Sequence, residues 1–211
     1  MYIAVEGVIG VGKTTLVRSL KEAFAAEVCL EVFEENPFLA LFYEDRERYA
    51  FQTQMFFLLS RYHQQRREIP DRIHRDNGSL LSDYTFDKDA IFARLNLAGD
   101  ELEMYFNIHA ALAEKIPRPD LEVYLWADTP VLMERIALRD RPYERNMERD
   151  YIDRLNQTYT EYFAAYGGVV LTIDTNSLDF VHNREDLDIV EDRIRQALKL
   201  APFQSELPLE N

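Results

Sequence analysis

The chain has 211 residues with a formal net charge of −14, and 47% of its residues are hydrophobic. This length and apolar content suit one sizeable α/β domain and are too small for two ordinary ones. The acidic surface repels nucleic acid and anionic lipid at long range, which disfavours nucleic acid as a partner. No apolar run approaches the ~20 residues that cross a bilayer, so no membrane association is expected.

The single cysteine indicates a reducing compartment. Cys29 lies in an apolar, strand-like run and has no second cysteine with which to pair, so we expect a buried thiol. The sequence opens directly on strand-like residues, without a basic stretch or a cleavage pattern. Together these features favour a cytoplasmic protein.

Short β-branched or apolar runs alternate with longer helical patterns along the chain. This alternation is typical of a mostly parallel sheet with helices on both faces. We therefore expect one five-stranded α/β domain over residues 1–200 and a flexible acidic tail over 201–211. The expected strands are 2–5, 28–33, 79–82, 121–126 and 169–173. The expected helices are 13–24, 47–68, 88–97, 100–115, 130–138, 149–166 and 183–198.

A glycine-rich segment separates the first strand from the first helix. Residues 7–14 match G-x-x-x-x-G-K-[ST], the P-loop pattern, at every specified position. Glycines let backbone N–H groups turn toward phosphate oxygens, and the start of the helix adds its positive dipole end. We expect Lys13 on the β- and γ-phosphates of ATP and the Thr14 hydroxyl on Mg²⁺. The expected ATP-binding residues here are Gly7, Val8, Ile9, Gly10, Val11, Gly12, Lys13, Thr14 and Thr15.

Three acids stand close together at the end of the second expected strand: Glu31, Glu34 and Glu35. The carboxyl ends of parallel strands form the ligand crevice, where a carboxylate can take the proton of an acceptor hydroxyl. A phosphorylated acceptor would need a basic clamp here and would be repelled by the acids. The expected acceptor is therefore a neutral nucleoside, with Glu34 and Glu35 in a solvated turn.

Further candidates lie on the next helix and near the third strand. Gln54 and Arg61 stand two turns apart on one face of the expected helix 47–68. An amide offers both a donor and an acceptor to the edge of a base. Asp83 ends the third expected strand and is a candidate to organise Mg²⁺ through water or to share the role of base with Glu31.

Several separated motifs between residues 3 and 198 resemble those of the deoxynucleoside kinases, most closely the bacterial deoxyguanosine/deoxyadenosine kinases. They are the P-loop with Glu6 before it, Glu31 to Phe38, Phe42-Tyr43, Phe51 to Gln54 with Ser60-Arg61, Asp83-Tyr84 with Ile91 to Ala93, the segment 135–144, and Asp179 to Val181. The resemblance implies a P-loop kinase fold and a Mg²⁺-dependent ATP:deoxynucleoside 5′-phosphotransferase of nucleotide salvage. It also implies a preference for purines and a homodimer, to which the helix 100–115 would contribute.

The resemblance assigns roles to the candidate residues one position at a time. Glu31 is the expected general base on the 5′-hydroxyl, although Val32 stands where the family usually has proline. Tyr43 and Glu144 are expected to hold the sugar 3′-hydroxyl. Gln54 is expected to read the base. Arg61 is expected to work with an aspartate, for which Asp89 is the candidate. The family carries arginine after the acid that matches Asp83, and here that residue is Tyr84.

Five arginines fall within fifteen residues: Arg135, Arg139, Arg141, Arg145 and Arg149. Guanidinium groups supplied by a closing loop stabilise the charge of a transferring phosphoryl group. The resemblance implies that Arg135, Arg139 and Arg141 form such a lid over the phosphates. We expect Arg145 and Arg149 to be solvated and paired with nearby acids. The histidines lack ligand spacing, so no metal site made by histidine is expected.

Two alternatives to deoxynucleoside phosphorylation remain open. A nucleoside monophosphate kinase resembling thymidylate kinase would need a basic clamp near Glu31, whereas Leu30 and Val32 flank it. A nucleotide-binding regulator without turnover would need neither a base nor an arginine lid. The residues therefore favour a phosphotransferase.

Overall fold

The computed structural model of the protein describes residues 1–32, 35–74 and 78–200. In this part of the chain five strands form one parallel sheet in the order β2-β3-β1-β4-β5. The strands are β1 (Tyr2–Gly7), β2 (Glu27–Cys29), β3 (Leu80–Ser82), β4 (Leu121–Trp126) and β5 (Val170–Asp174). All five strands end at the same edge of the sheet, which is where ligands bind in open α/β folds.

The central strand β1 explains why the sheet must be covered on both faces. All six of its residues are buried. A parallel strand that is covered by helices on both faces has no side in contact with water. Ile3 stands level with Leu81 on one neighbouring strand and with Leu121 on the other. The P-loop therefore leaves the sheet from its centre.

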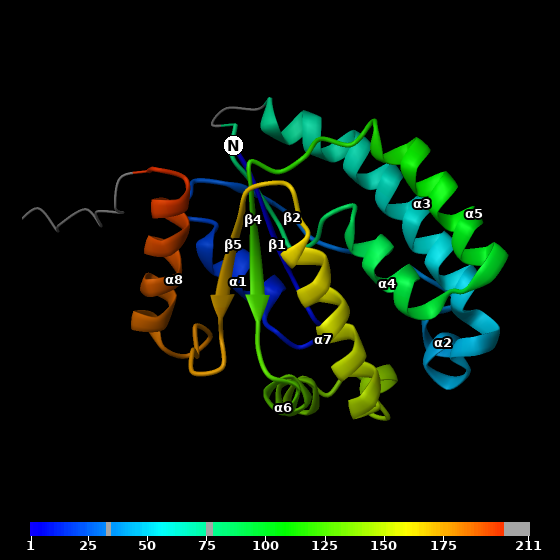
Figure 1. The fold of residues 1–211 in the computed structure, drawn as a ribbon. Helices are drawn as coiled ribbons and strands as arrows, with labels where there is room; N and C mark the ends of the chain where they lie inside the picture. Colours follow the sequence, from blue (N-terminus) through cyan, green and yellow to red (C-terminus); the bar gives the residue numbers. More distant parts are fainter. Residues whose placement is uncertain (33–34, 75–77, 201–211) are drawn as a thin grey trace, which may run out of the picture.

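Helices enclose the sheet, as Figure 1 shows. The helices α1 and α8 pack together on one side, whereas α4 packs between α3 and α7 on the other. The helices are α1 (Lys13–Leu20), α2 (Leu39–Glu44), α3 (Arg46–Ile73), α4 (Lys88–Asn96), α5 (Gly99–Ala113), α6 (Thr129–Arg139), α7 (Arg149–Ala164) and α8 (Arg184–Ala197). A short 3₁₀ helix, η1, spans Pro142–Glu144.

The longest helix, α3, has a defined start. The carboxylate of its N-cap residue Asp45 accepts a hydrogen bond of 3.2 Å from the backbone N–H of Arg48, which satisfies one of the free donors of the first turn. Its 28 residues carry Gln54 and Arg61 to the same buried face. One rigid element thus sets the distance between these two side chains.

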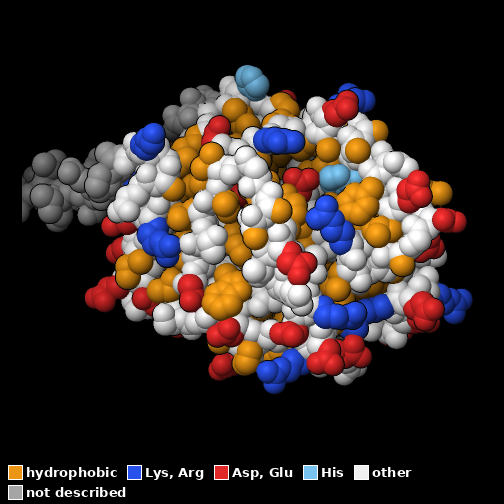
Figure 2. All heavy atoms as spheres, in the orientation of Figure 1, with side chains coloured by type: hydrophobic (Ala, Val, Ile, Leu, Met, Phe, Trp, Pro, Cys, Tyr) orange, Lys and Arg blue, Asp and Glu red, His pale blue; other side chains and the backbone are white. Residues whose placement is uncertain are grey.

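The surface over α5 and α7 contains a second hollow, outside the edge where the strands end. Figure 2 shows hydrophobic side chains among charged ones on this side of the molecule. Phe106, Tyr162 and Tyr166 are among the residues that line the hollow, whose volume is about 570 Å³. No helix within the described residues is both long and apolar enough to cross a bilayer.

The five expected strands and seven expected helices are confirmed, with four differences. α1 ends at Leu20, before the expected end at residue 24. β2 ends at Cys29, so Leu30 and Glu31 leave the sheet and turn toward the site. α3 begins at Arg46 and runs to Ile73, through Pro70. The sequence did not predict α2, whose six residues have no side-chain cap to mark their start. The expected tail 201–211, and Glu34 of the acidic cluster, lie outside the described residues.

Candidate active site

The P-loop joins β1 to α1 and needs glycine at three tight positions, Gly7, Gly10 and Gly12. Gly12 has a φ of 104°, and a Cβ there would lie 2.8 Å from the ring of Phe180. Gly7 packs so closely against the neighbouring strand β4 that a Cβ would lie 2.4 Å from the carbonyl oxygen of Leu125. Residues with a side chain would therefore displace the loop, since L-residues disfavour this backbone region.

Lys13 begins α1 and folds back over the loop. Its Nζ donates hydrogen bonds to the carbonyl oxygens of Gly7 at 2.7 Å and Val8 at 3.1 Å. Burial, followed by the like charge of Lys88, lowers the pKa of Lys13 to about 7. An anionic group in the loop would favour the charged ammonium, because an opposite charge raises the pKa of an amine.

Asp83 connects the loop to the end of β2. It accepts a hydrogen bond from the Thr14 hydroxyl through Oδ2 and another, of 2.8 Å, from the backbone N–H of Glu31 through Oδ1. A hydroxyl and a carboxylate side by side are the hard oxygen donors that Mg²⁺ prefers. Thr14 and Asp83 therefore fit the metal that a P-loop kinase uses.

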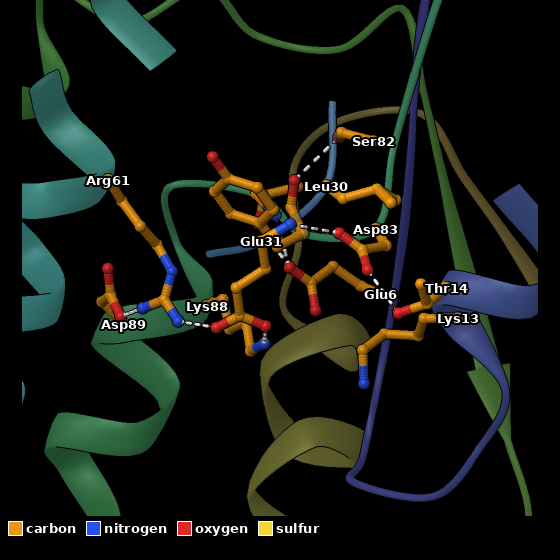
Figure 3. Close-up of polar contacts among 12 residues, drawn as sticks. Glu6, Lys13, Thr14, Leu30, Glu31, Arg61, Ser82, Asp83, Lys88 and Asp89 are labelled. Carbon is orange, nitrogen blue, oxygen red and sulfur yellow. Dashed lines mark hydrogen bonds and ion pairs between the residues drawn. The ribbon is translucent and has the colours of Figure 1, made fainter. Parts of the chain in front are cut away.

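The Glu31 carboxylate lies between two cations from different helices (Figure 3). Arg61 of α3 donates to Oε1 and Lys88 of α4 donates to Oε2. Burial alone would raise the pKa of Glu31, but the charges of Lys88 and Arg61 together hold it well below its usual range. Lys13 lies on the side of this site that faces the P-loop (Figure 3). Glu31 is thus an ionised carboxylate held close to the phosphate loop.

A cavity of about 260 Å³ runs from the P-loop to the first half of α3, where Thr53, Gln54, Phe57 and Arg61 line it. Gln54, Arg61 and Asp89 line its inner end, where Arg61 pairs with Asp89 Oδ1. The buried oxygen atoms Gln54 Oε1 and Asp89 Oδ2 accept no hydrogen bond from the described residues. A buried polar atom without a partner is costly, so the inner end fits a ligand that carries N–H donors.

The segment after α6 covers the opposite wall of the cavity. Glu144 of η1 is buried and accepts from Arg139 at 2.6 Å, and Arg141 lies 3.7 Å from its other oxygen. Tyr43 of α2 stacks on Tyr143 with ring centroids 5.9 Å apart. Burial raises the pKa of Tyr43 well above its ordinary value, so its hydroxyl stays neutral and able to donate.

The family model of the deoxynucleoside kinases matches residues 3–199. The match covers nearly the whole chain and includes every residue of the cavity. The chain belongs to the deoxynucleoside kinase family. Its resemblance to that family, seen in the separated motifs of the sequence, is therefore confirmed.

Several relatives in this family cover almost the full chain. The chain is 34% identical to deoxyguanosine kinase of Bacillus subtilis (strain 168) over 202 residues, which are 93% of this chain and 97% of that protein. It is 31% identical to deoxyguanosine kinase of Lactobacillus acidophilus, over 93% of this chain and 90% of that protein. It is 27% identical to deoxyadenosine/deoxycytidine kinase of Bacillus subtilis, over 93% of this chain and 92% of that protein.

Solved structures share the fold of this deoxynucleoside kinase. Deoxyadenosine kinase from M. mycoides with bound dATP superimposes with a TM-score of 0.78 at 22% identity, over 92% of this chain and 99% of that chain. The same enzyme with dCMP and dCDP bound gives a TM-score of 0.79 at 23% identity, over 93% of this chain and 100% of that chain. The expected P-loop kinase fold is thus confirmed, with all five strands parallel.

The structure brings most of the expected site residues of this kinase into one cavity. Those that line it are Ile9, Lys13, Thr14, Glu31, Tyr43, Gln54, Arg61, Asp83, Asp89, Arg139, Arg141 and Glu144. Those outside its lining are Gly7, Val8, Gly10, Val11, Gly12, Thr15 and Arg135. Arg135 instead donates to the carbonyl oxygens of Thr175 at 2.6 Å and Leu178 at 3.2 Å, in the loop after β5. As expected, Arg145 is exposed and paired with Asp140.

Sequence reasoning missed Lys88 as a partner of Glu31. The available signal was a lysine in the first turn of a helix whose neighbours Ala90 and Ile91 are apolar, where a solvated lysine would be out of place. Tyr84, which replaces the arginine of the family pattern, is fully buried and donates to Gln64 Oε1 at 2.6 Å. Tyr84 lies outside the lining of the cavity, with its ring centre 5.6 Å from the guanidinium carbon of Arg61, and its neutral phenol supplies no charge.

Proposed function

We propose that this deoxynucleoside kinase transfers the γ-phosphoryl group of ATP to the 5′-hydroxyl of a purine deoxynucleoside, in nucleotide salvage. The observation that carries this proposal is the continuity of one cavity. It leads from the P-loop, past the ionised Glu31, to buried acceptor atoms at its inner end. The cavity thus offers the P-loop to the phosphates of ATP, Glu31 to the reacting hydroxyl, and the buried acceptor atoms to the base of the nucleoside.

ATP would bind with its phosphates on residues 7–15. Backbone N–H groups and the N-terminus of α1 would receive the β- and γ-phosphates, and the Lys13 ammonium would leave the Gly7 and Val8 carbonyls to contact them. Arg139 and Arg141 line the same cavity and would neutralise the oxygens of the transferring group. Arg135 is also proposed to contribute to ATP binding, from the side of the loop after β5.

The transfer step would form a bond between the 5′-oxygen and the γ-phosphorus and break the bond from that phosphorus to ADP. Glu31 would take the proton of the 5′-hydroxyl. Because such transfer passes through a loose transition state, the position of the carboxylate counts more than its basicity. Thr14 and Asp83 would hold Mg²⁺, which supplies charge neutralisation on the β- and γ-phosphates when bound. Asp83 also fixes the backbone of Glu31.

The inner end of the cavity would hold the nucleoside. Tyr43 and Glu144 would bind the sugar 3′-hydroxyl. Gln54 and Asp89 each offer a buried, unfilled acceptor oxygen among the described residues, and Arg61 holds Asp89 in place. Both guanine and adenine carry N–H donors on their base-pairing edge. Two of the relatives, which are both named deoxyguanosine kinase, support a purine as the preferred base.

A phosphorylation panel tests this function. Purified protein with Mg²⁺ and labelled ATP would be offered deoxyguanosine, deoxyadenosine, deoxycytidine, thymidine, the ribonucleosides, dTMP and dAMP. We expect rapid transfer to deoxyguanosine or deoxyadenosine and little to dTMP. Transfer to monophosphates alone would establish a nucleoside monophosphate kinase, and nucleotide binding without any transfer would establish a regulator.

We also propose that the enzyme is a cytoplasmic homodimer. The buried single thiol, Cys29, suits a reducing compartment. Met104 is exposed on α5, the helix that the resemblance implies at the interface, and offers an apolar contact for a second copy. Light scattering on the native protein should give twice the mass of one chain. Met104→Glu should then give a monomer if this surface is the interface.

A further inference from the structure

Lys88 is a buried lysine that neither the P-loop motif nor the arginine lid explains. It is the first residue of α4, and only 7% of it is exposed. Its Nζ lies 5.9 Å from the centre of the Phe92 ring and donates to Glu31 Oε2. Lysine is rarely buried unless it is paired, so this placement requires a partner, and Glu31 is that partner.

The charges around Glu31 balance only when Lys88 is counted. Arg61 bonds both Glu31 and Asp89, so one cation from α3 serves two buried carboxylates. Lys88 supplies the second cation, from α4. These four side chains then sum to zero net charge in a site that is largely closed to water. Removing Lys88 would leave one buried negative charge without compensation.

The two cations also grip different oxygen atoms of the same carboxylate. Arg61 lies on the side of Oε1, and Lys88 lies on the side of Oε2 (Figure 3). A single contact would let the carboxylate rotate about its last side-chain bond, whereas two contacts from separate helices fix its plane. The backbone of Glu31 is held in addition by Asp83. Tyr84, which stands where the family pattern has arginine, is a neutral phenol that donates to Gln64, so it offers no alternative cation.

We propose that Lys88 is a positioning residue for phosphoryl transfer, which holds the Glu31 carboxylate in the orientation that receives the 5′-hydroxyl. The inference rests on the proposed function, because it gives Glu31 the role of base. Lys88 acts through Glu31 and contributes little to the binding of ATP. Misplacing a reacting group by a small distance costs transfer rate, whereas binding of the remote parts of the substrates is kept.

Steady-state kinetics of Lys88→Met, Lys88→Arg and the control Lys21→Met test this inference. Lys21 is an exposed lysine that caps the C-terminal end of α1, opposite to the end that carries Lys13, and it does not line the cavity. We expect Lys88→Met to lower kcat about 10–100-fold while KM for ATP stays within about twofold. Lys88→Arg should recover most of the loss, since it restores a cation, and Lys21→Met should behave like the native enzyme. Near-native kcat in Lys88→Met would overturn the inference.

A double-mutant cycle separates action through Glu31 from direct action on the phosphates. In a Glu31→Gln background, adding Lys88→Met should lower kcat by less than about threefold, because there is no carboxylate left to position. An additional loss as large as in the native background would overturn the inference and place Lys88 on the transferring group instead. If Lys88→Met does not fold, as judged by circular dichroism, the same cycle with Lys88→Gln decides.

The native enzyme distinguishes this inference from the proposed function. If the native protein phosphorylates no deoxynucleoside, then the proposed function has failed, and the role of Lys88 fails with it. If the native protein phosphorylates deoxynucleosides and Lys88→Met does so equally well, only the role of Lys88 has failed.

Discussion

The two ends of the cavity are built in different ways. The phosphate end consists largely of one continuous segment, residues 7–14. Its backbone N–H groups are the expected phosphate donors, and its lysine already has hydrogen-bond partners. The nucleoside end collects side chains from α2, α3, α4 and η1, and it contains the buried acceptor oxygens of Gln54 and Asp89 that no described residue satisfies. The phosphate end is thus preformed, whereas the inner end has polar atoms that would gain hydrogen bonds from a ligand.

This difference separates general chemistry from specificity. Backbone N–H groups and a lysine accept any nucleoside triphosphate chain that fits the loop. Side-chain oxygens with unfilled hydrogen bonds select among bases, because a base without the right donor leaves them unpaired. Changes at the phosphate end should therefore abolish transfer for every acceptor. Changes at the nucleoside end should redistribute it among acceptors.

Lys13→Met should produce the largest effect. The variant keeps the length of the side chain and removes the only cation of the P-loop segment 7–14. We expect kcat/KM to fall by ~10³-fold for every deoxynucleoside, because charge stabilisation in the transition state is lost. Steady-state assays across the acceptor panel measure this. Loss confined to one acceptor would contradict the division between the two ends.

Glu31→Gln should follow in size. An amide keeps the shape of the carboxylate and cannot accept the proton, so we expect turnover to fall by ~10²-fold or more while ATP binding persists. Single-turnover kinetics and fluorescence titration with a nucleotide analogue measure the two quantities separately. Asp83→Asn is the matched comparison. Near-normal turnover in Glu31→Gln would assign the base to Asp83 or to no residue.

Gln54→Ala should act on preference more than on rate. The native amide oxygen is buried and has no partner in the described part of the chain, so a base with an N–H donor gains a bond there. We expect the ratio of kcat/KM between preferred and disfavoured nucleosides to fall ~10-fold, with little change in ATP binding. Gln52→Ala, exposed on the other side of α3, is the control. An unchanged ratio would mean that Gln54 does not read the base.

The same contrast explains what the sequence could and could not predict. The P-loop, β1 and α1 are contiguous, so motif and strand pattern predicted the position of Lys13 and Thr14 at the start of α1. The long helix α3 fixed Gln54 and Arg61 on one face by its period alone. Lys88 was missed because its partner Glu31 stands 57 positions away in the sequence and meets it only in the folded chain. Arg135 is likewise turned toward the loop after β5, a contact that no local pattern encodes.

Glu122 is a buried carboxyl outside the cavity with an oxygen that lacks a partner, so it tests whether every such oxygen belongs to a ligand site. The expected effect of changing it is the smallest of the series. Its side chain lies on β4, outside the cavity, and Oε2 accepts no hydrogen bond from the described residues. Burial, with a smaller contribution from the neighbouring charge of Glu6, raises the pKa of Glu122 from an ordinary value of 4.5 to about 8, although the hydrogen bond from Tyr166 opposes the shift. The carboxyl group is then protonated in the folded protein at neutral pH, so it needs no external donor.

The sign of the pH effect follows from this raised pKa. Between about pH 5 and about pH 8 the folded state keeps a proton that the unfolded chain has lost, so the contribution of Glu122 to stability falls as the pH rises through this window. Glu122→Gln carries a neutral amide at every pH and should reduce the loss of unfolding free energy across the window by about 1–3 kcal/mol. Urea unfolding at several pH values measures it, with Glu103→Gln, an exposed residue of α5, as the control. An unchanged pH dependence would show that Glu122 ionises freely. The kcat of Glu122→Gln in the transfer assay should equal that of the native enzyme, because Glu122 belongs to neither end of the cavity.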